Sequence, residues 1–518
     1  MIQKSSLVSA LKADPQRDNH VRSVHNAHYS YVSTEKFENA TIISLNEDLA
    51  LEIGFTKNEI ESKTLKNQLA GNDDYLGQSF AMNYGGHQFG HWAGQLGDGR
   101  AINIGEVKST KGIKQLQLKG AGPTPYSRRG DGYAVLRSSI REHLCSEAMH
   151  HLGVPTTRSL SLALSGNDVY RDMFYDGNAA YEKGAIVCRV AASFIRFGNF
   201  QIHAVNNEKE ELRQIADYTI ENYFPQIHST GIEKYIRFFE EVANSTLTTI
   251  MHWQRVGFVH GVMNTDNMSI LGLTIDYGPY GWLDNYDPGW TPNTTDNQHK
   301  RYRYGAQPEI GLWNLWQLAN ALYVLVEDSQ PLEQILNNYK TQFQTEQLKM
   351  MRAKLGLQNQ LLEDVELIQK LDELMQLHET DMTIFYRELG KIDYRTNIDQ
   401  AIEIITVSFY NANQMPSSTI DKWREWMIAY LQRLVEESAF AKVRSHQMQH
   451  TNPKYVLRNY IAQLVIEDAE KGNYKLLDEV NSMLKNPYAE QPEMEKWYAK
   501  RPDWARNKPG SSQLSCSS

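Results

Sequence analysis

Apolar residues along the 518-residue chain follow two spacings, which divide it into a strand-rich first part and a helical second part. Alternating and β-branched runs predict strands at 41–45, 101–104, 114–120, 156–165 and 184–192. Apolar positions three or four residues apart predict helices at 47–53, 133–152, 232–258, 311–327, 361–377 and 420–436. Strands dominate the chain before residue 198 and helices dominate after it, which predicts an α+β protein.

The same pattern, together with proline and polar content, predicts three segments. Residues 1–198 form a β-rich N-lobe that contains an N-terminal extension, a glycine-rich loop, a strand ending in lysine and one helix. Residues 199–485 form a large, mostly helical C-lobe with a helical C-terminal extension. Residues 486–518 are rich in proline and polar residues, so we expect a flexible tail with an exposed Cys516.

Composition is that of a soluble globular protein, with 41% hydrophobic and 22% charged residues. A net charge of −9 argues against a general nucleic-acid binder. No apolar run reaches the roughly 18 residues of a membrane span. Three cysteines cannot form a disulfide framework, which indicates a reducing compartment. Because the first residues also lack a signal or transit pattern, we expect a cytoplasmic protein without membrane partners.

The segment HGVMNTDNMSILGLTIDYG, residues 260–278, carries the strongest chemical pattern. His260 and Asn267 have the spacing of the kinase catalytic loop H-R-D-x-x-x-x-N, and Asp276-Tyr277-Gly278 takes the place of the Asp-Phe-Gly turn. Asn and Asp oxygens can hold a divalent cation against phosphates. Val262 stands where the kinase base would be, but Asp266 is a nearby acid that could accept a proton. Taken alone, Asp266 and Asn267 could also be ordinary turn residues.

A glycine-rich segment, NYGGHQFGHWAGQLGDGRA, precedes the second predicted strand. Glycine allows a backbone to turn tightly and approach phosphate oxygens. The segment fits a turn between two strands, and it matches neither a Rossmann fingerprint nor a Walker A loop. His87 and His91 are four residues apart, but without an acidic third ligand they give little support for a metal site.

Several charged residues follow in the order expected of a kinase N-lobe. Lys119 ends a predicted strand, as the phosphate-binding lysine does in kinases. The next helix offers Glu142 or Glu147 as its partner, and the apolar periodicity slightly favours Glu147. Arg189 and Arg196 lie among apolar residues and need anionic partners, which could be phosphates or the protein's own acids. This order predicts a bilobal, protein-kinase-like fold.

Longer motifs resemble one family closely. The segments NYGGHQFG, GDGRA, LKGAGPTPYSRRGDG, LRSSIRE, HGVMNTDN with DYGP, and NPKYVLRNY are similar to those of the selenoprotein O family of pseudokinase-fold enzymes. The resemblance implies a protein adenylyltransferase, in which ATP binds flipped relative to kinases and AMP passes to a hydroxyl of a protein Ser, Thr or Tyr. Uridylylation from UTP is associated with bacterial members.

The resemblance also implies a role for each matching residue. Asp266 would be the base, Asn267 and Asp276 would hold Mg²⁺ or Mn²⁺, and Glu142 would be the partner of the lysine. The nucleotide would be bound by Gly97, Gly99, Arg100, Lys119, Asp131, Gly132, Arg189, Arg196 and Asp276. Many eukaryotic members carry selenocysteine near the C-terminus, where this chain has Cys516.

Three other functions are compatible with parts of the sequence. A phosphate-transferring kinase would use the same fold, and a catalytically inactive scaffold would only bind nucleotide. A redox protein is disfavoured because the cysteines form no paired motif. The protein targets, the preference for ATP or UTP, and the choice of Mg²⁺ or Mn²⁺ are not encoded in any motif.

Overall fold

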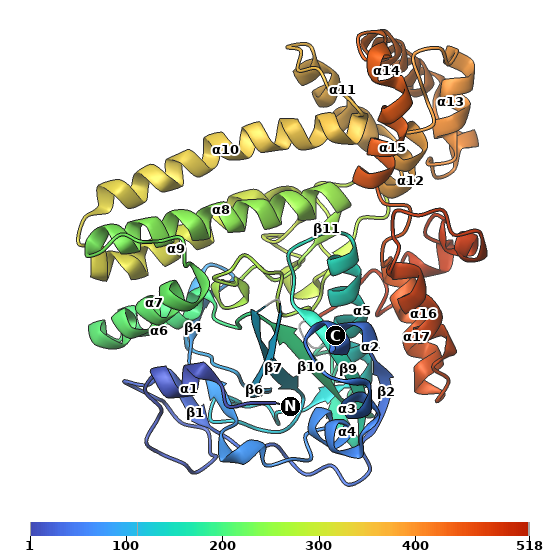
Figure 1. Ribbon diagram of the computed structural model, residues 1–518. Coiled ribbons are helices and arrows are strands. Elements are labelled where there is room, and N and C mark those ends of the chain that lie inside the picture. Colours follow the sequence, from blue (N-terminus) through green and yellow to red (C-terminus); the bar gives the residue numbers. More distant parts are fainter. Residues whose placement is uncertain (1, 111, 516–518) are drawn as a thin grey trace.

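The computed structural model describes residues 2–110 and 112–515 and shows an antiparallel sheet followed by a large helical part (Figure 1). In the described residues the main sheet has eight strands in the order β1-β3-β6-β7-β10-β9-β2, with β8 paired to β10. Its strands are β1 (Tyr29–Tyr31), β2 (Thr41–Leu45), β3 (Phe80–Met82), β6 (Ala101–Ser109), β7 (Gly112–Lys119), β8 (Ala134–Val135), β9 (Arg158–Arg171) and β10 (Ala180–Ala191). This confirms the α+β prediction at the level of an N-terminal antiparallel sheet and a helical C-terminal part.

Two short pairs of strands lie outside the main sheet. The glycine-rich segment forms a hairpin of β4 (Gly85–Gln88) and β5 (His91–Gln95). The pair β11 (Phe258–Val259) and β12 (Gly281–Trp282) encloses the segment 260–278. Because β11 precedes this segment and β12 follows it, their pairing fixes the positions of both ends of the loop.

Successive side chains of β10 are buried on opposite faces of the main sheet. Ala185 and Val187 pack in the apolar cluster that includes α5 (Leu136–His151). Ile186 and Cys188 pack on the opposite face, under α2 (Glu47–Glu52), α3 (Lys57–Glu61) and α4 (Lys63–Leu69). The period-two alternation of a strand produces this division. Cys145 and Cys188 are buried free thiols, and Cys516 lies outside the described residues.

The helical part begins immediately after the sheet. Its first helices are α6 (Phe197–Val205), α7 (Lys209–Tyr223), α8 (Ile232–Val256), α9 (Gln307–Val326) and α10 (Ser329–Leu355). The long helices α8, α9 and α10 pack side by side, and α1 (Ser6–Ala10) adds Leu7 to the same apolar cluster (Figure 1). The boundary that the sequence analysis places after residue 198 falls inside α6.

The remaining helices form two groups, one at the C-terminal end of α10 and one beside α5 (Figure 1). One consists of α11 (Asp364–Leu377), α12 (Met382–Leu389), α13 (Ile398–Thr406), α14 (Ser417–Val435) and α15 (Ala441–Thr451). The other consists of α16 (Asn459–Glu470) and α17 (Lys475–Leu484), which pack against α5. None of the helices in the described ranges combines the length and the apolar character needed to cross a membrane.

The segment 486–515, which the sequence analysis expects to be flexible, packs against the rest of the chain. Lys454 pairs with Glu490 and Glu495, each at 2.6 Å. Leu514 is fully buried and its carbonyl accepts a hydrogen bond from the backbone N–H of Thr294 at 2.7 Å. Proline and polar content did not predict these contacts, because the partner residues, Lys454 and Thr294, lie outside the segment and far from it in the sequence.

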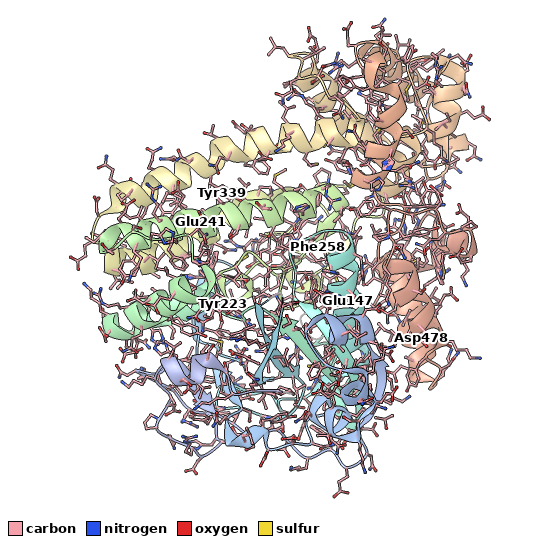
Figure 2. The ribbon with its side chains drawn as sticks, in the orientation of Figure 1. Glu147, Tyr223, Glu241, Phe258, Tyr339 and Asp478 are labelled. Carbon is pink, nitrogen blue, oxygen red and sulfur yellow. The ribbon has the colours of Figure 1, made fainter. Side chains whose placement is uncertain are left out.

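Residues 478–485 at α17 and the C-terminal half of α5 border one groove, where Glu147 and Asp478 are found (Figure 2). His143, fully buried beside this groove, hydrogen-bonds Ser159 at 2.7 Å and Ser44 at 3.0 Å. Burial lowers the pKa of His143 to about 4, although the charge of Glu147 acts in the opposite direction. The ring is therefore neutral in the folded protein at pH 7.

His143 should make folding sensitive to mild acid. Its folded pKa lies below the ordinary 6.5, so the unfolded state binds more protons between pH 6.5 and about 4, and stability falls as the pH falls. From pH 7 to pH 5, this one group should cost about 2 kcal/mol of unfolding free energy. We expect the His143→Gln variant to lose about 2 kcal/mol less than the wild type over this interval, as measured by denaturant titration. Equal losses in both proteins would contradict the assignment.

Candidate active site

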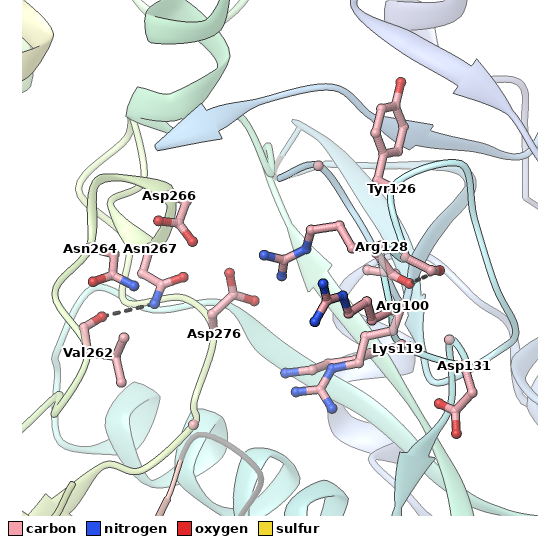
Figure 3. Close-up of a pocket in the computed structure, with 18 of the residues that line it drawn as sticks. Arg100, Lys119, Tyr126, Arg128, Asp131, Val262, Asn264, Asp266, Asn267 and Asp276 are labelled. Carbon is pink, nitrogen blue, oxygen red and sulfur yellow. Dashed lines mark hydrogen bonds between the residues drawn. The ribbon is translucent and has the colours of Figure 1, made fainter. Parts of the chain in front are cut away.

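A cleft of about 1050 Å³ lies between the main sheet and the loop 260–278 (Figure 3). Most of the residues selected from the sequence line it: Gly97, Gly99, Arg100, Lys119, Asp131, Gly132, Arg189, Asp266, Asn267 and Asp276. The other two, Glu142 and Arg196, are buried behind its wall and pair with lining residues. The fold thus brings together residues from segments separated by up to 179 positions, from Gly97 to Asp276.

The cationic wall of the cleft is built on the sheet and braced by α5. Lys119, the last residue of β7, forms an ion pair with Glu142 of α5. Arg189 of β10 approaches the same carboxylate, with its Nη1 3.1 Å from Oε1. Glu147, which periodicity slightly favoured, lies on another face of α5 and pairs with Arg158 at 2.8 Å.

Asp276 lies at the centre of the cleft, between the two walls (Figure 3). Its Oδ1 accepts a hydrogen bond from Arg189 at 2.6 Å, and its Oδ2 accepts one from Arg196. Burial alone would raise the pKa of Asp276, but the charges of Arg196, Arg189 and Lys119 outweigh it and hold the pKa well below its ordinary value. Asp276 is therefore ionised throughout the physiological range. Its φ of 56° is in the left-handed region, a strained conformation for Asp that is common at functional sites.

Arg196 connects the sheet to the loop 260–278. It precedes α6, and its Nη1 donates to the backbone carbonyl of Asp266 at 2.9 Å. Its guanidinium lies 4.5 Å from the centre of the Tyr84 ring and 3.9 Å from a carboxylate oxygen of Asp98. Arg196 thus pairs with acids of the protein itself, which was one of the two alternatives that the sequence left open; the other was a bound phosphate.

Asp266 lies on the wall opposite the cations, in a short 3₁₀ segment, Thr265–Asn267 (Figure 3). Only 8% of it is exposed, and burial raises its pKa to about 6, against the opposing effect of a hydrogen bond from Gln88. Its Oδ1 has no hydrogen-bond partner within the described part of the chain. Oδ1 is buried against Gly86, whereas Oδ2 accepts one hydrogen bond and keeps a lone pair that can accept a proton from a hydroxyl bound in the cleft that Asp266 lines.

Asn267 is oriented by its neighbour. Its Nδ2 donates to the backbone carbonyl of Val262 at 2.9 Å, which leaves its Oδ1 as the atom that can bind a cation. Among residues 2–110 and 112–515, no three His, Cys, Asp or Glu side chains are grouped as a metal site. Any cation here would need oxygen ligands from a bound molecule in addition to Asn267 and Asp276.

Gly97 and Asp131 belong to the two loops that close the cleft on the sheet side. A Cβ on Gly97 would lie 2.3 Å from the Tyr126 ring, and its φ is 68°, so only glycine allows the loops to meet. Asp131 forms a bidentate pair with Arg171, at 2.6 and 2.7 Å. Asp131 thus ties the loop to β9.

The lining residues that sequence reasoning did not select as site residues include Gln88, Arg128 and Tyr175. Arg128 points toward Asp276 (Figure 3) and forms no ion pair within the described ranges. The adjacent arginines in SRRGDG were a visible signal for it. No sequence signal marked Gln88, because its contact with Asp266 spans 178 positions.

Comparison with known sequences decides the family. A profile described as "Protein adenylyltransferase SelO" matches residues 13–485. The chain belongs to this family. Full-length relatives include a protein nucleotidyltransferase YdiU from Flavobacterium johnsoniae, 54% identical over 509 residues that cover 98% of each chain. Another, from Aromatoleum aromaticum, is 48% identical over 524 residues, covering 100% of this chain and 99% of the relative. A third, from Rhodopirellula baltica, is 50% identical and covers 98% and 97%.

Membership in the family confirms the resemblance drawn from the motifs. It also confirms the predicted enzyme class: the protein is a protein adenylyltransferase, a nucleotidyltransferase whose substrates are a nucleotide and proteins. The cleft described above, with cations on one wall and a carboxylate on the other, is the candidate site of this reaction.

Proposed function

We propose that the protein transfers AMP from ATP to Ser, Thr or Tyr hydroxyls of other proteins, with the triphosphate tail directed into the cleft. One observation carries the proposal: buried cations and the Asp266 carboxylate line opposite walls of one cavity. The distal phosphates need several cations, and the acceptor hydroxyl needs a nearby base. A tail directed inward places the α-phosphorus between the two walls.

The cation count supports this orientation. Arg100, Lys119, Arg189 and Arg196 carry four positive charges, and Glu142, Asp276 and Asp98 balance three of them. Arg100 forms no ion pair in the described part of the chain and lines the cleft. The surplus positive charge is available for the β- and γ-phosphates, and these charges would also stabilise the leaving pyrophosphate.

A bilobal, protein-kinase-like fold is part of the proposal. The pair between Lys119 of β7 and Glu142 of α5 has the form of the kinase pair between the third strand and its helix. The segment 260–278 follows in kinase order, with Asn267 and Asp276 in the positions of the metal-binding residues. The sheet would be the N-lobe, and the helices from α6 onward the C-lobe.

Asn267 and Asp276 would hold Mg²⁺ or Mn²⁺. The Oδ1 of Asn267 and the carboxylate of Asp276 are the hard oxygen ligands that these ions prefer, and the phosphates would complete the shell. When bound, the ion neutralises phosphate charge. The oxygens of Asp276 already accept from Arg189 and Arg196, but each retains further lone-pair capacity for a cation.

The residues of the chain then divide the reaction between them. Asp266 accepts the proton of the acceptor hydroxyl, whose oxygen bonds to the α-phosphorus. The bond from that phosphorus to the bridging oxygen breaks, and pyrophosphate leaves toward Lys119 and Arg100. Val262 stands where a kinase has its base, so the side chain at that position cannot accept the proton of an acceptor hydroxyl.

The test is the fate of the label from ATP. The full-length protein is incubated with Mg²⁺ or Mn²⁺ and ATP labelled at either the α- or the γ-phosphate, with lysate proteins as acceptors. We expect incorporation of the α-label only, with an intact-mass increase of one AMP. Incorporation of the γ-label would support the kinase alternative, and no incorporation would support the inactive scaffold. A parallel incubation with labelled UTP tests uridylylation.

Lys119→Met should weaken catalysis strongly. The variant removes one charge-assisted contact to phosphate and leaves Glu142 to pair with Arg189 alone. We expect kcat/KM for ATP to fall about 100-fold, which corresponds to about 3 kcal/mol. The matched control is Lys114→Met, five residues earlier on the same strand and outside the cleft lining. An equal loss in the control, or none in Lys119→Met, would exclude this role.

A further inference from the structure

The β4–β5 hairpin is bonded directly to the loop that carries Asp266. The backbone N–H of His87 donates to Thr265 Oγ1 at 2.7 Å. The backbone N–H of Phe89 donates to the side chains of Asn264, at 3.3 Å, and Tyr302, at 2.9 Å. The glycine-rich sequence predicted a backbone that approaches phosphates. The hairpin within it instead contacts the loop that carries Asp266.

The hairpin is also braced from behind by α6. The Nδ2 of Asn199 donates to the backbone carbonyl of Asn83 at 2.9 Å. Gln201 lies 3.2 Å from the His87 ring nitrogen. A Cβ on Gly198 would lie 2.1 Å from the carbonyl oxygen of Gly85, so the two backbones are in close contact. The hairpin is therefore a fixed support for whatever it contacts.

Two residues of the hairpin meet the Asp266 carboxylate itself. Gln88 Nε2 donates to Asp266 Oδ2 at 3.2 Å. Gly86 packs so closely that a Cβ there would lie 2.7 Å from Oδ1 and 2.9 Å from the Asp266 Cβ. One carboxylate oxygen is thus held by an amide, while the other has no hydrogen-bond partner in the described residues.

We propose that Gln88 is a positioning residue that, together with Gly86, fixes the orientation of the Asp266 carboxylate. Oδ1 is buried against Gly86, and Oδ2, which accepts from the Gln88 amide, keeps a second lone pair that accepts the proton of the acceptor hydroxyl. The inference rests on the proposed function, in which Asp266 is the base. In this role Gln88 acts through the orientation of Asp266, although its side chain also lines the cleft. Gly86 allows the hairpin to come close enough for Gln88 to reach the carboxylate.

Two substitutions at position 88 separate this role from simple packing. Gln88→Ala removes the amide, and Gln88→Glu keeps its size and shape but has no N–H to donate. We expect both variants to lower kcat about 10- to 100-fold, as for a misplaced catalytic group. The KM for ATP should stay within about twofold, because the phosphate-binding cations are untouched. AMP incorporation from ATP into casein, a serine-rich acceptor protein, supplies both constants.

The matched control is His91→Ala, which alters the exposed position paired with Gln88 across the hairpin and should leave kcat unchanged. Melting temperatures of all variants show whether the fold is intact. A Gln88→Glu enzyme with the wild-type kcat, alongside an inactive Asp266→Asn enzyme, overturns the positioning role alone. An Asp266→Asn enzyme with the wild-type kcat overturns both this inference and the proposed base.

Discussion

Replacing Asp276 with asparagine should abolish AMP transfer. The substitution keeps the size of the side chain but removes the charge that pairs with Arg189 and Arg196 and the carboxylate proposed to hold the metal. We expect the rate to fall at least about 10³-fold, equivalent to about 4 kcal/mol of transition-state stabilisation. Intact-mass analysis after incubation with ATP should show no added AMP in the variant and one in the wild type.

Asp276→Asn should also lower stability, because it leaves two buried guanidinium groups with less negative charge. Removing one partner of a buried pair typically costs about 3–5 kcal/mol. The melting temperature therefore has to be measured beside the activity, at a temperature where the variant remains folded. Asp421→Asn, an exposed change on α14, is the control and should keep full activity. A folded Asp276→Asn protein with normal AMP transfer would exclude the metal-binding role.

Replacing Asp266 with asparagine should separate catalysis from nucleotide binding. The amide cannot accept a proton as the carboxylate does, so we expect kcat to fall about 10²- to 10⁴-fold. Binding of ATP should change little, because Lys119, Arg189 and Arg100 remain in place on the other side of the cleft. Label incorporation from α-labelled ATP gives the rate, and titration with a non-hydrolysable ATP analogue gives the dissociation constant.

The stability of Asp266→Asn serves as its internal control. Burial disfavours the charged form of Asp266, so a neutral amide of the same size should leave the melting temperature unchanged or raise it. A variant that loses both activity and melting temperature would indicate a structural role in the catalytic loop. One that loses ATP binding instead would show that Asp266 contacts the nucleotide.

Local patterns in the sequence identified the main elements well. The predicted helix at 133–152 is α5, Leu136–His151, and the predicted strand at 114–120 is β7, Gly112–Lys119. Their periodicities reflect burial on one or both faces, which repeats every 3.6 or 2 residues. The short strands β1, β3 and β4 escaped prediction, because three or four residues are too few to establish a period. β5 has five residues but no β-branched side chain, unlike β2 of the same length.

The partner of Lys119 shows where periodicity stops being informative. Glu142 and Glu147 are separated by five residues, so their side chains leave the helix about 140° apart. Both are buried, and the apolar stripe of α5 cannot tell which of them faces β7. The resemblance to the family named Glu142, and the structure pairs Glu142 with Lys119 and Glu147 with Arg158.

The sequence by itself determined the α+β class, the enzyme family and the residues from which the cleft is built, because each is written in local periodicity or in contiguous motifs. Only the tertiary structure decided how these residues pair: Asp276 between two arginines, Asp131 with Arg171, and Gln88 against Asp266. Such contacts join segments far apart along the chain, and neither periodicity nor a motif encodes the direction in which a side chain points across a cavity.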